Sequence, residues 1–476
     1  MDIILGELFN FRILVIELVD AEILNTTLTV IGGGPGGYSA ALRGAQLGAD
    51  VVLIEKEKLG GICLNIGCIP SKLLLYTTGI LKQVDNAVKA GTIRGTSHLD
   101  IKHLLNHKNS LINDMVTELE KLLKRNGIKV VYGHGRLSSV GIVEVDRKKR
   151  PLKINSNAII IATGSSPSIP SIPGVLYADT TEYIPNIKRV PTSIVIIGGG
   201  PEGVEFANIF RDMGTDVTLV EAKDHLLPLE DDDVGKVLEN ILCESGVNVF
   251  LKTIVSGISE SDGVKTVSIQ QNGNKKKLVT EIVVVAMGRK PNIKNIGLDA
   301  LSISTSNGLI QVDQNMATSI KGIFAVGDVV GGGLAHVASI QGTVATENAL
   351  GLDTVYDGLA IPRCIYSHPQ VATVGLNEKM AKSKGFDVII GKSKMNKNIK
   401  SLIIGETQGF AKILVEFKSK KVLGVQIIGE CASEVISEAT LAIKLGTTAK
   451  DISDIVHPYP TFSEALSEAA REIKLK

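Results

Sequence analysis

Net charge is almost absent from this sequence: 51 lysine and arginine residues stand against 50 aspartate and glutamate residues among 476, for a formal net charge of +1. A protein that grips nucleic acid or an anionic membrane surface carries a basic excess, so we expect neither as a partner. Cysteine is also scarce. Five cysteines, an odd number in a long chain, exclude the disulfide framework of a small secreted domain and favour a reducing, cytoplasmic location.

Uninterrupted apolar runs are missing too. Residues 1–27 are mostly apolar, but acidic residues such as Glu7 and Glu17 break the run, and Arg12 is its only basic residue. A signal peptide needs a basic start and an unbroken apolar core, and a membrane helix needs about 20 apolar residues with few charges. We therefore interpret residues 1–27 as an extension that is docked on the surface, as a helix, or loosely ordered. We expect no membrane span later in the chain.

The first nucleotide-binding signal follows this extension. Leu28–Ile31 is a short apolar run typical of a buried strand, and GGGPGG after it supplies Gly32, Gly34 and Gly37 before a helical pattern. Such glycines let the backbone turn tightly and approach a pyrophosphate at the helix N-terminus. A second strand, DVVLIE, ends at Glu55, where a carboxylate can bond a ribose hydroxyl. The pattern predicts a bound dinucleotide.

The same unit occurs again in SIVIIGGGPEGVEFANIFRDMGTDVTLVE. Its glycines and its acid, each 166 positions after their counterparts, are Gly198, Gly200, Gly203 and Glu221. One register relates two dinucleotide folds, which predicts two bound dinucleotides. A carboxylate at the end of the second strand favours the free ribose hydroxyl of NAD and repels the 2′-phosphate of NADP. The second site is therefore predicted to bind NAD, a preference that the nearby Lys223 and His225 weaken.

A shorter repeat joins two strand ends. IIIATGSSP and VVVAMGRKP match at an offset of 124, which pairs Ala162 with Ala286, Gly164 with Gly288 and Pro167 with Pro291. Small residues after an apolar strand suit tight chain exits where each nucleotide domain joins its neighbour. Two unrelated strand ends give so short a match as well, and the residues alone leave both interpretations open.

The segments between and after these repeats contribute helices and a last sheet. Residues 73–130 have an amphipathic helical pattern in which His103 and His107 show a metal-ligand spacing, but no acid or cysteine accompanies them, so we expect a solvated face and no metal. In IFAVGDVV, residues 323–330, Asp328 follows a predicted strand and either bonds a cofactor hydroxyl or caps a helix near Leu334. From about residue 360, strands and helices form a separate α+β unit.

The stretch GGICLNIGCIPSK, residues 60–72, holds two cysteines five positions apart. Cys63 and Cys68 can close a small loop where the chain is helical or turn-like, and they can also be two buried free thiols. Their place favours the first interpretation, since a cofactor bound by the first glycine loop and its acid lies within reach of this stretch. In a reducing compartment, a disulfide that survives is usually catalytic.

These motifs resemble those of the pyridine nucleotide–disulfide oxidoreductases. GICLNIGC with IPSK, both glycine loops, AVGDV, LAH and PTFSEA agree in order from about residue 28 to the C-terminus, and GGICLNIGCIPSK is most similar to the dihydrolipoyl dehydrogenases. The resemblance implies FAD in the first fold, NAD in the second, and a homodimer whose active sites borrow residues from the partner's C-terminus. It implies oxidation of dihydrolipoyl groups with NAD+. A lipoyl-bearing carrier protein of a 2-oxoacid dehydrogenase or glycine cleavage complex is then a partner.

The resemblance also implies roles for single residues. Cys68 lies against the flavin as the charge-transfer thiolate, Cys63 exchanges with substrate, and Lys72 forms an ion pair with Glu205 beside the flavin. The residues implied to contact the cofactors, besides those of the two glycine loops, are Lys72, Gly135 near the adenine end, Gly288, Asp328 and Ala335.

One departure from the family concerns the acid–base group. The family reads HxHPTxSE, whereas this chain reads HPYPTFSE, so His457 takes the place of the first histidine and Tyr459 that of the catalytic one. Glu464, which orients the imidazole in the family, is then expected to orient a phenol. A free tyrosine has a pKa of about 10 and a free histidine of about 6.5, so tyrosine is a poor general base at neutral pH. His457 is the alternative base, although two prolines fix the direction of the segment.

This departure leaves other functions open. One alternative is an NADH-dependent reductase on the same scaffold that acts on another disulfide, a metal ion, a quinone or oxygen. Another is a flavoprotein retained as a structural subunit of a multienzyme complex, against which the intact Cys63, Cys68 and Lys72 argue.

Taken together, the sequence predicts an α/β protein with two Rossmann-like dinucleotide-binding domains and a C-terminal α+β dimerisation domain. The predicted divisions are an N-terminal extension at 1–27, the first part of the FAD-binding domain at 28–160, the NAD-binding domain at 161–285, the second part of the FAD-binding, central domain at 286–355, and the interface domain at 356–476.

Overall fold

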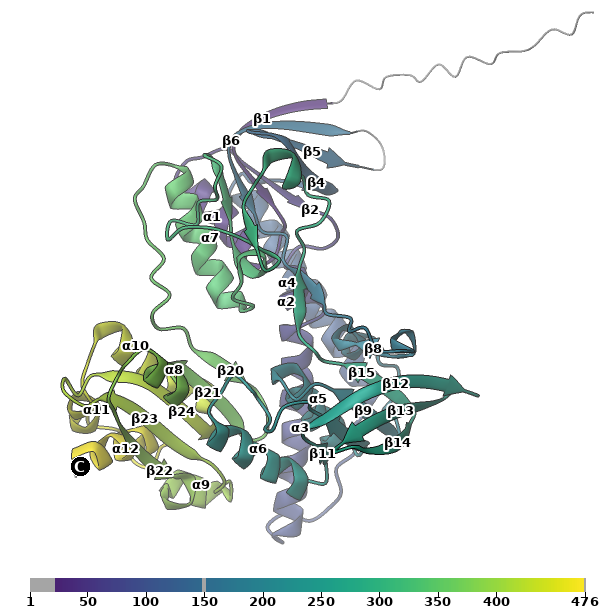
Figure 1. Ribbon diagram of the computed structural model, residues 1–476, viewed down its shortest axis with the longest axis vertical. Helices are drawn as coiled ribbons and strands as arrows, with labels where there is room; N and C mark the ends of the chain where they lie inside the picture. The colour runs from purple at the N-terminus through teal and green to yellow at the C-terminus, as the bar shows by residue number, and fades with distance from the viewer. Residues whose placement is uncertain (1–21, 148–150, 475–476) are drawn as a thin grey trace, which may run out of the picture.

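The structure is a computed structural model and describes residues 22–147 and 151–474. Strand β1 (Glu22–Ile31) lies inside a parallel sheet with the order β3-β2-β1-β6, and β19 pairs with β6. The other strands are β2 (Val51–Glu55), β3 (Lys129–Tyr132), β6 (Leu152–Ile161) and β19 (Ile323–Ala325). Helices α1 (Pro35–Gln46) and α7 (Ala335–Ala349) pack together on this sheet (Figure 1). Strand β2 is buried along its whole length, which is typical of a parallel sheet covered on both faces.

Two predicted boundaries in this sheet are wrong. Strand β1 begins at Glu22 and not near Leu28, because its first residues pair with β6 from Leu152 onward. The rest of the predicted extension, residues 1–21, lies outside the described residues. Strand β19 ends at Ala325, and Gly327–Val330 forms the 3₁₀ turn η4, so the strand predicted over 323–330 is shorter than expected.

The second nucleotide fold repeats the first down to its strand register. Its parallel sheet has the order β11-β10-β9-β15-β8. Ile194 pairs with Val217 as Leu28 pairs with Val51, at the same offset of 166. The elements are β8 (Asp179–Thr180), β9 (Ser193–Ile197), α5 (Pro201–Asp212), β10 (Asp216–Val220), α6 (Asp232–Glu244), β11 (Asn248–Phe250) and β15 (Ile282–Val285).

Antiparallel sheets complete the chain. Strands β4 (His134–Ser139) and β5 (Ile142–Asp146) extend the first sheet beyond β6, and β12 (Thr253–Ser261), β13 (Val264–Gln271) and β14 (Asn274–Thr280) form a separate meander. The C-terminal sheet has the order β20-β21-β24-β23-β22, with strands Arg363–Ile365, Gln370–Gly375, Val422–Gly429, Phe410–Glu416 and Val388–Lys394. Its helices are α8 (Glu378–Ser383), α9 (Ile399–Ile404), α10 (Ala432–Leu445), α11 (Ala449–Asp454) and α12 (Glu464–Lys474). This confirms the predicted fold class, while the division points between domains stay predictions.

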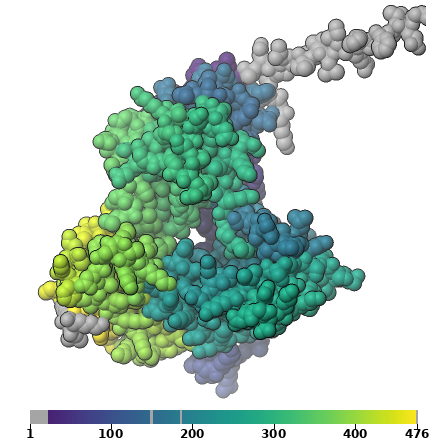
Figure 2. All heavy atoms as spheres, viewed as in Figure 1, coloured from purple at the N-terminus to yellow at the C-terminus, as the bar shows by residue number. Residues whose placement is uncertain are grey.

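One long helix connects the parts of the molecule. Helix α3 (Cys68–Lys89) starts beside the first fold and runs along α5 of the second, with α4 (Ile101–Arg125) beside it (Figure 1). Leu74 and Leu75 of α3 are 0% and 2% exposed and belong to the core of the second fold. The outline of the molecule narrows between the upper part, with the first fold, and the lower part (Figure 2). The start of α3 therefore lies where the two nucleotide folds face each other.

The helical segment Gly61–Lys89 is long and apolar enough, by length and composition, to cross a membrane. The prediction that no stretch after the N-terminus meets this test is therefore wrong. Helix α3 is apolar because its inner side packs on the second fold, where Leu74 and Leu75 are buried. A core helix of this kind passes the same test, so one such segment is weak evidence for a membrane span.

Candidate active site

The two cysteines lie on either side of a short break between helices. Cys63 is on α2 (Gly61–Asn65), and Cys68 is the first residue of α3. Asn65 holds the turn, because its Nδ2 donates hydrogen bonds to the carbonyl oxygens of Leu59 and Gly61, both at 2.9 Å. Both cysteines are unbridged in the structure, and a hydrogen bond joins their side chains.

The two sulfurs differ in acidity. The hydrogen bond from Cys63 lowers the pKa of Cys68 to about 7, against the effect of burial and with help from the Lys72 ammonium. The same hydrogen bond, together with burial, raises the pKa of Cys63. Near neutral pH the negative charge therefore resides on Cys68, at the N-terminus of α3, where a thiolate is favoured. This is the sulfur that the family resemblance implies as the thiolate beside the flavin.

An ion pair links this sulfur to the second nucleotide fold. Lys72 Nζ, one turn after Cys68, lies 2.9 and 2.8 Å from the two carboxylate oxygens of Glu205 on α5. The backbone N–H of Tyr366 donates to Glu205 Oε1 at 3.0 Å, and Lys72 Nζ lies 4.8 Å from the centre of the Tyr366 ring. Burial opposes the charge, but Glu205 and Cys68 outweigh it and raise the pKa of Lys72. The predicted pair is present; its position beside a flavin stays a prediction.

The first glycine of each nucleotide loop cannot be replaced without a clash. Gly32 and Gly198 adopt φ values of +110° and +116°, a region that favours glycine. A Cβ at these positions would lie 2.2 Å from the carbonyl oxygen of Ala162 and 2.3 Å from that of Ala286. The carbonyl groups that exclude a side chain at the two loops are equivalent, because Ala162 directly follows β6 and Ala286 directly follows β15.

The other glycines of the loops fit a bound pyrophosphate. A Cβ on Gly37 would lie 1.7 Å from the carbonyl oxygen of Gly32, and a Cβ on Gly203 would lie 1.9 Å from that of Gly198. Each helix therefore packs tightly against the first residue of its loop. At Gly34 the nearest atom is 3.9 Å away, and at Gly200 nothing lies within 4 Å. Neither α1 nor α5 has a side chain that caps its N-terminus in the described structure, which leaves the first N–H groups of each helix for an anion.

The two acidic residues are held in the same way. Glu55 accepts hydrogen bonds from the backbone N–H groups of Gly33 at 2.7 Å and Glu57 at 2.8 Å. Glu221 repeats both bonds 166 positions later, at 2.6 and 2.7 Å, the second from the backbone N–H of Lys223. Both carboxylates are buried against their glycine loops. Each loop therefore presents the acid that a ribose hydroxyl needs, and the residues fit a dinucleotide in both folds.

The shorter repeat is structural. The segments predicted to be equivalent form β7 (Ser165–Pro167) and β16 (Arg289–Pro291), and these pair antiparallel with each other. Gly164 and Gly288, which precede them, have φ values of +69° and +83°. This supports the interpretation as equivalent chain exits and contradicts the interpretation as unrelated strand ends.

Asp328 meets this pair of strands. Its Oδ2 accepts a hydrogen bond from Ser165 Oγ at 2.5 Å, and Arg289 Nε donates to the same Ser165 Oγ at 2.9 Å. Helix α7 begins at Ala335 with Leu334 as its N-cap and receives no side-chain cap, so the alternative that Asp328 caps this helix is wrong. The implied cofactor contacts of Asp328 and Ala335 stay predictions.

Gly135 packs inside the first fold. It lies on β4, and a Cβ there would be 3.2 Å from side-chain carbons of Ile31 and Ile54. The glycine therefore lets β4 approach the strands that carry the first nucleotide loop. Its implied place near the adenine stays a prediction.

The C-terminal segment does not show the expected dyad. Tyr459 is 72% exposed. Glu464 Oε2 accepts a hydrogen bond from the backbone N–H of Thr461 at 2.8 Å, and the described residues show no hydrogen bond between this carboxylate and the phenol. His457 is buried, with Nε2 3.0 Å from Glu438 Oε1 and Nδ1 3.1 Å from a backbone oxygen. The phenol of Tyr459 is therefore exposed to solvent, whereas the imidazole of His457 is held inside the protomer.

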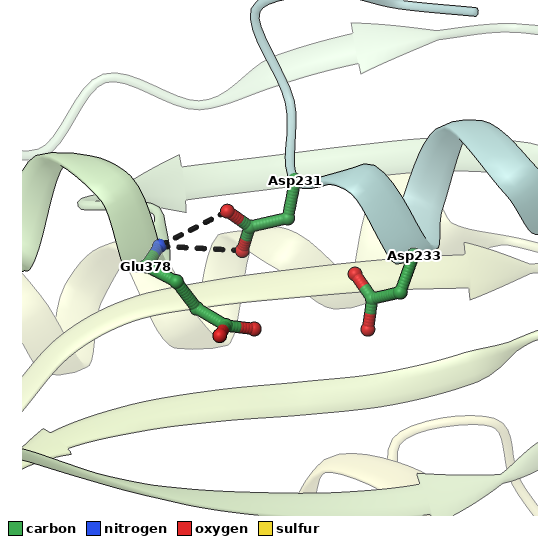
Figure 3. A group of neighbouring side chains, drawn as sticks. All are labelled: Asp231, Asp233 and Glu378. Carbon is green, nitrogen blue, oxygen red and sulfur yellow. Dashed lines mark hydrogen bonds between the residues drawn. The ribbon is translucent and has the colours of Figure 1, made fainter. Parts of the chain in front are cut away.

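Carboxylates also gather away from the cysteines, at the junction of the second fold and the C-terminal sheet. Among the described residues, Asp231, Asp233 and Glu378 are close enough to hold a metal ion (Figure 3). The Lys412 ammonium, on a side chain 1% exposed, lies 2.9, 2.7 and 2.9 Å from them. A cation of the protein's own already occupies this place. The histidine predicted to be solvated on α4, His103, bonds Asp100 at the helix start.

Sequence reasoning missed several residues of the site. Tyr366, Ser165 and Arg289 were not expected there, and neither was the carboxylate of Glu202 in the second glycine loop. The first three lie on short strands or turns without periodicity, so only their neighbours in space identify them. Glu202 left a signal that could have been used, since it is the one difference between GGGPGG and GGGPEG.

The fold and the site together define a disulfide oxidoreductase with two dinucleotide-binding folds and a cysteine pair between them. The family model described as pyridine nucleotide-disulphide oxidoreductase matches residues 26–342, and the model of the dimerisation domain of the same family matches residues 361–470. The chain belongs to this family and is an oxidoreductase. The family uses FAD and NAD(H), which confirms the two predicted cofactors at this level.

The chain is similar in sequence to several dihydrolipoyl dehydrogenases. That of Geobacillus stearothermophilus is 37% identical over 453 residues, covering 94% of this chain and 96% of the relative. That of Bacillus subtilis is 36% identical over 462 residues, covering 93% and 97%. Among solved structures, the Cu(II) complex of the HOCl-induced flavoprotein disulfide reductase RclA from Escherichia coli matches with a TM-score of 0.84 at 26% identity, covering 94% of this chain and 99% of RclA.

Proposed function

We propose that this chain is a dihydrolipoyl dehydrogenase, which oxidises dihydrolipoyl groups to the cyclic lipoyl disulfide and reduces NAD+. The observation that carries the proposal is the line Cys63, Cys68, Lys72 and Glu205, which connects a sulfur pair at the first nucleotide fold to α5 of the second. The dihydrolipoyl dehydrogenases 33–37% identical to the chain over most of its length support the same substrate.

The chemistry begins with thiol–disulfide exchange at the oxidised pair. A substrate thiolate attacks Cys63, the bond from Cys63 to Cys68 breaks, and Cys68 leaves as a thiolate, which its lowered pKa makes a good leaving group. The second substrate thiolate then attacks the substrate sulfur bound to Cys63, so Cys63 departs and the substrate leaves as the cyclic disulfide. The two substrate protons pass to the acid–base group and solvent, and the electron pair remains on the cysteines.

The chain's own residues hold the reduced pair ready for reoxidation. Lys72 lies near the Cys68 thiolate and is itself fixed by Glu205, which in turn is anchored by the backbone N–H of Tyr366. The glycine loops at Gly32 and Gly198, with Glu55 and Glu221, are the groups that would hold FAD and NAD. The flavin, when bound, supplies the route by which the electron pair passes from the sulfurs to the nicotinamide.

The test combines a spectrum with a turnover assay. Flavin-loaded protein reduced by two electrons under anaerobic conditions is expected to show a long-wavelength band, because a thiolate donates charge to an oxidised flavin. Dihydrolipoamide is expected to be oxidised with NAD+. A Cys63→Ser variant is expected to lose this activity and to show the band before any reductant is added, because its Cys68 is already a free thiolate beside the oxidised flavin. A protein that turns over at the same rate without Cys63 would show that the disulfide plays no part.

A second candidate is a reductase that passes electrons from NADH to another disulfide, a metal ion, a quinone or oxygen. Two observations favour it: the exposed phenol of Tyr459 where the family has an imidazole, and the structural similarity to RclA, whose structure is described as a Cu(II) complex. Rates with NADH and lipoamide, compared with rates with cupric ion, a quinone and oxygen, separate the two candidates.

The proposal includes a homodimer in the cytoplasm, served by a lipoyl-bearing carrier protein. Support for the dimer comes from the match to the dimerisation domain and from large apolar side chains left exposed on α10 and the segment after α11, namely Leu441, Leu445, Val456 and Tyr459. Light scattering of the purified chain tests the dimer. Pull-down with lipoylated and unlipoylated carrier domains tests the partner.

A further inference from the structure

The two glycine loops differ at one position. The first reads GGGPGG and the second GGGPEG, so Gly36 corresponds to Glu202. A Cβ on Gly36 would lie 3.2 Å from both the carbonyl oxygen of Ala338 and a methyl carbon of Val326, because α7 closes this side of the first loop. In the second loop the corresponding residue is Glu202, which lies half-buried in the first turn of α5. The second site therefore carries a carboxylate at the position where the first is tightly packed.

The charged groups around Glu202 belong to the redox site. Glu205, one turn further along α5, lies on the same side of the helix and holds Lys72. Arg289 of β16 and Glu182 of the 3₁₀ helix η2 (Thr181–Asn186) are the other charges that act on it. Three carboxylates and two cations leave this group with a net negative charge when all are ionised. Burial raises the pKa of Glu202, while Arg289 and Lys72 oppose that rise.

The position of Glu202 matches the path that a dinucleotide must take. Its pyrophosphate is expected on the loop from Gly198 to Gly200, and its reactive ring must approach the cysteines, since the electron pair starts there. From the loop to Cys68, the protein presents Glu202, then Glu205, then Lys72. The nicotinamide half therefore passes the carboxylate of Glu202. The oxidised ring carries one positive charge that the reduced ring lacks.

We propose that Glu202 is a specificity-determining residue that makes the second site prefer NAD+ to NADH. Its carboxylate attracts the positive ring and has no such attraction for the neutral one. The consequence is a site that takes up the oxidised nucleotide and releases the reduced one, which favours dithiol oxidation over disulfide reduction. This inference rests on the proposed function, because it places the nicotinamide between the second loop and the cysteines.

The experiment measures dissociation constants by calorimetry on the flavin-loaded full chain. NAD+ is titrated into the oxidised protein and NADH into the protein fully reduced under anaerobic conditions, so that neither nucleotide exchanges electrons with the flavin during the titration. Four proteins are compared: wild type, Glu202→Gln, Glu202→Asp, and Glu260→Gln, which makes the same charge change as Glu202→Gln at an exposed position on β12. In Glu202→Gln we expect the ratio of the NADH constant to the NAD+ constant to fall about three- to tenfold, as for loss of one partly screened charge interaction. Glu260→Gln is expected to keep the wild-type ratio, and Glu202→Asp, which keeps the charge, to retain most of it.

Two results overturn the proposal: an unchanged ratio in Glu202→Gln, and an equal weakening of both nucleotides, which would indicate a structural role. Flavin content of each variant confirms that the chain is folded. Failure of the proposed function is a different result. If dihydrolipoamide is not oxidised but the ratio still falls in Glu202→Gln, the proposed substrate is wrong and the proposed role of Glu202 is supported. If wild type binds neither nucleotide, both are wrong.

Discussion

Lys72 and Glu205 are separated by 133 positions in the chain, yet the ammonium of one lies 2.8 Å from the carboxylate of the other. The pair joins α3, which begins with Cys68, to α5 of the second nucleotide fold. Glu205 of the second nucleotide fold thus fixes the Lys72 ammonium, and this ammonium lowers the pKa of the Cys68 thiol, which is expected to deliver electrons.

Replacing Lys72 by methionine is expected to raise the pKa of Cys68 by about one pH unit, because the thiolate loses its nearest positive charge. The thiolate then forms over a more alkaline range than the value of about 7 in the native protein. Ultraviolet thiolate absorbance of the reduced protein as a function of pH measures this shift. Lys89→Met, at an exposed position at the end of the same helix, is the control and should leave the titration in place. A Lys72→Met curve that overlays the native one would separate the lysine from the thiol.

Gly203→Ala should abolish binding at the second nucleotide site and spare the flavin. The new Cβ would lie 1.9 Å from the carbonyl oxygen of Gly198, so α5 must move away from the loop. Gly200→Ala, where nothing lies within 4 Å, is the matched variant and tests whether a methyl group blocks the pyrophosphate itself. Calorimetry with NAD+ and the flavin spectrum read the two sites separately. Native-like NAD+ affinity in Gly203→Ala would contradict the assigned loop.

Tyr459→His is expected to move the pH optimum of dithiol oxidation to more acidic values. An imidazole accepts a proton at about pH 6.5, whereas a phenol does so only near pH 10, so the variant supplies a base at neutral pH. The exposed phenol leaves room for the smaller ring. Rate against pH for native protein, Tyr459→His and Tyr459→Phe measures the effect. An optimum that stays in place in Tyr459→His assigns proton removal to another group.

Lys412→Met should destabilise the junction between the second fold and the C-terminal sheet by about 3–5 kcal/mol, because three buried or half-buried carboxylates lose their shared cation. Lys379→Met removes a largely exposed partner of Asp232, whose ion pair is screened by solvent, and should destabilise the protein far less. Urea unfolding compares them.

The effect of pH on this junction has a definite sign. Despite burial, Lys392 and Lys412 lower the pKa of Asp233, so the stability that this carboxylate contributes is present at neutral pH and is lost as the pH falls through its lowered value. A loss of stability for Lys412→Met no larger than that of Lys379→Met would show that the buried cation is dispensable.

Much of the fold could be predicted because the residues that each nucleotide-binding unit requires lie close together in the sequence. Gly32, Gly37 and Glu55 act within one strand–loop–helix unit, where carbonyl oxygens exclude any side chain, so the same residues recur at Gly198, Gly203 and Glu221. The offset of 166 carries the strand register and the hydrogen bonds with it. The sequence places the start of β1 too late because Glu22–Thr26 reads EILNT, without an alternating pattern, and extends the strand only by pairing with β6, which is distant in sequence.

The site was harder to predict than the fold, because its residues are distant in sequence and meet only in the folded structure. Most of them were identified through the resemblance to the family. The pairing of Lys72 with Glu205 came from the family motif, since no spacing connects residues so far apart. Tyr366 reached the site through its backbone N–H, a group that every residue but proline has, so its identity gave no hint. Among the described residues Glu464 does not bond the phenol as expected. Its carboxylate accepts instead from a backbone N–H three residues earlier, a contact that the family motif does not reveal.

The acidic run at residues 230–233 has a practical consequence. Its members bind Arg363, Lys412, Lys379 and Lys392, all from the C-terminal part of the chain. The run follows directly on the loop from Glu221 to Leu227, whose last N–H bonds Gly199. The second nucleotide fold is therefore not a portable module. Transplanted into another scaffold without its four basic counterparts, it would carry a strip of unmatched negative charge beside the very loop meant to receive a phosphate-bearing ligand.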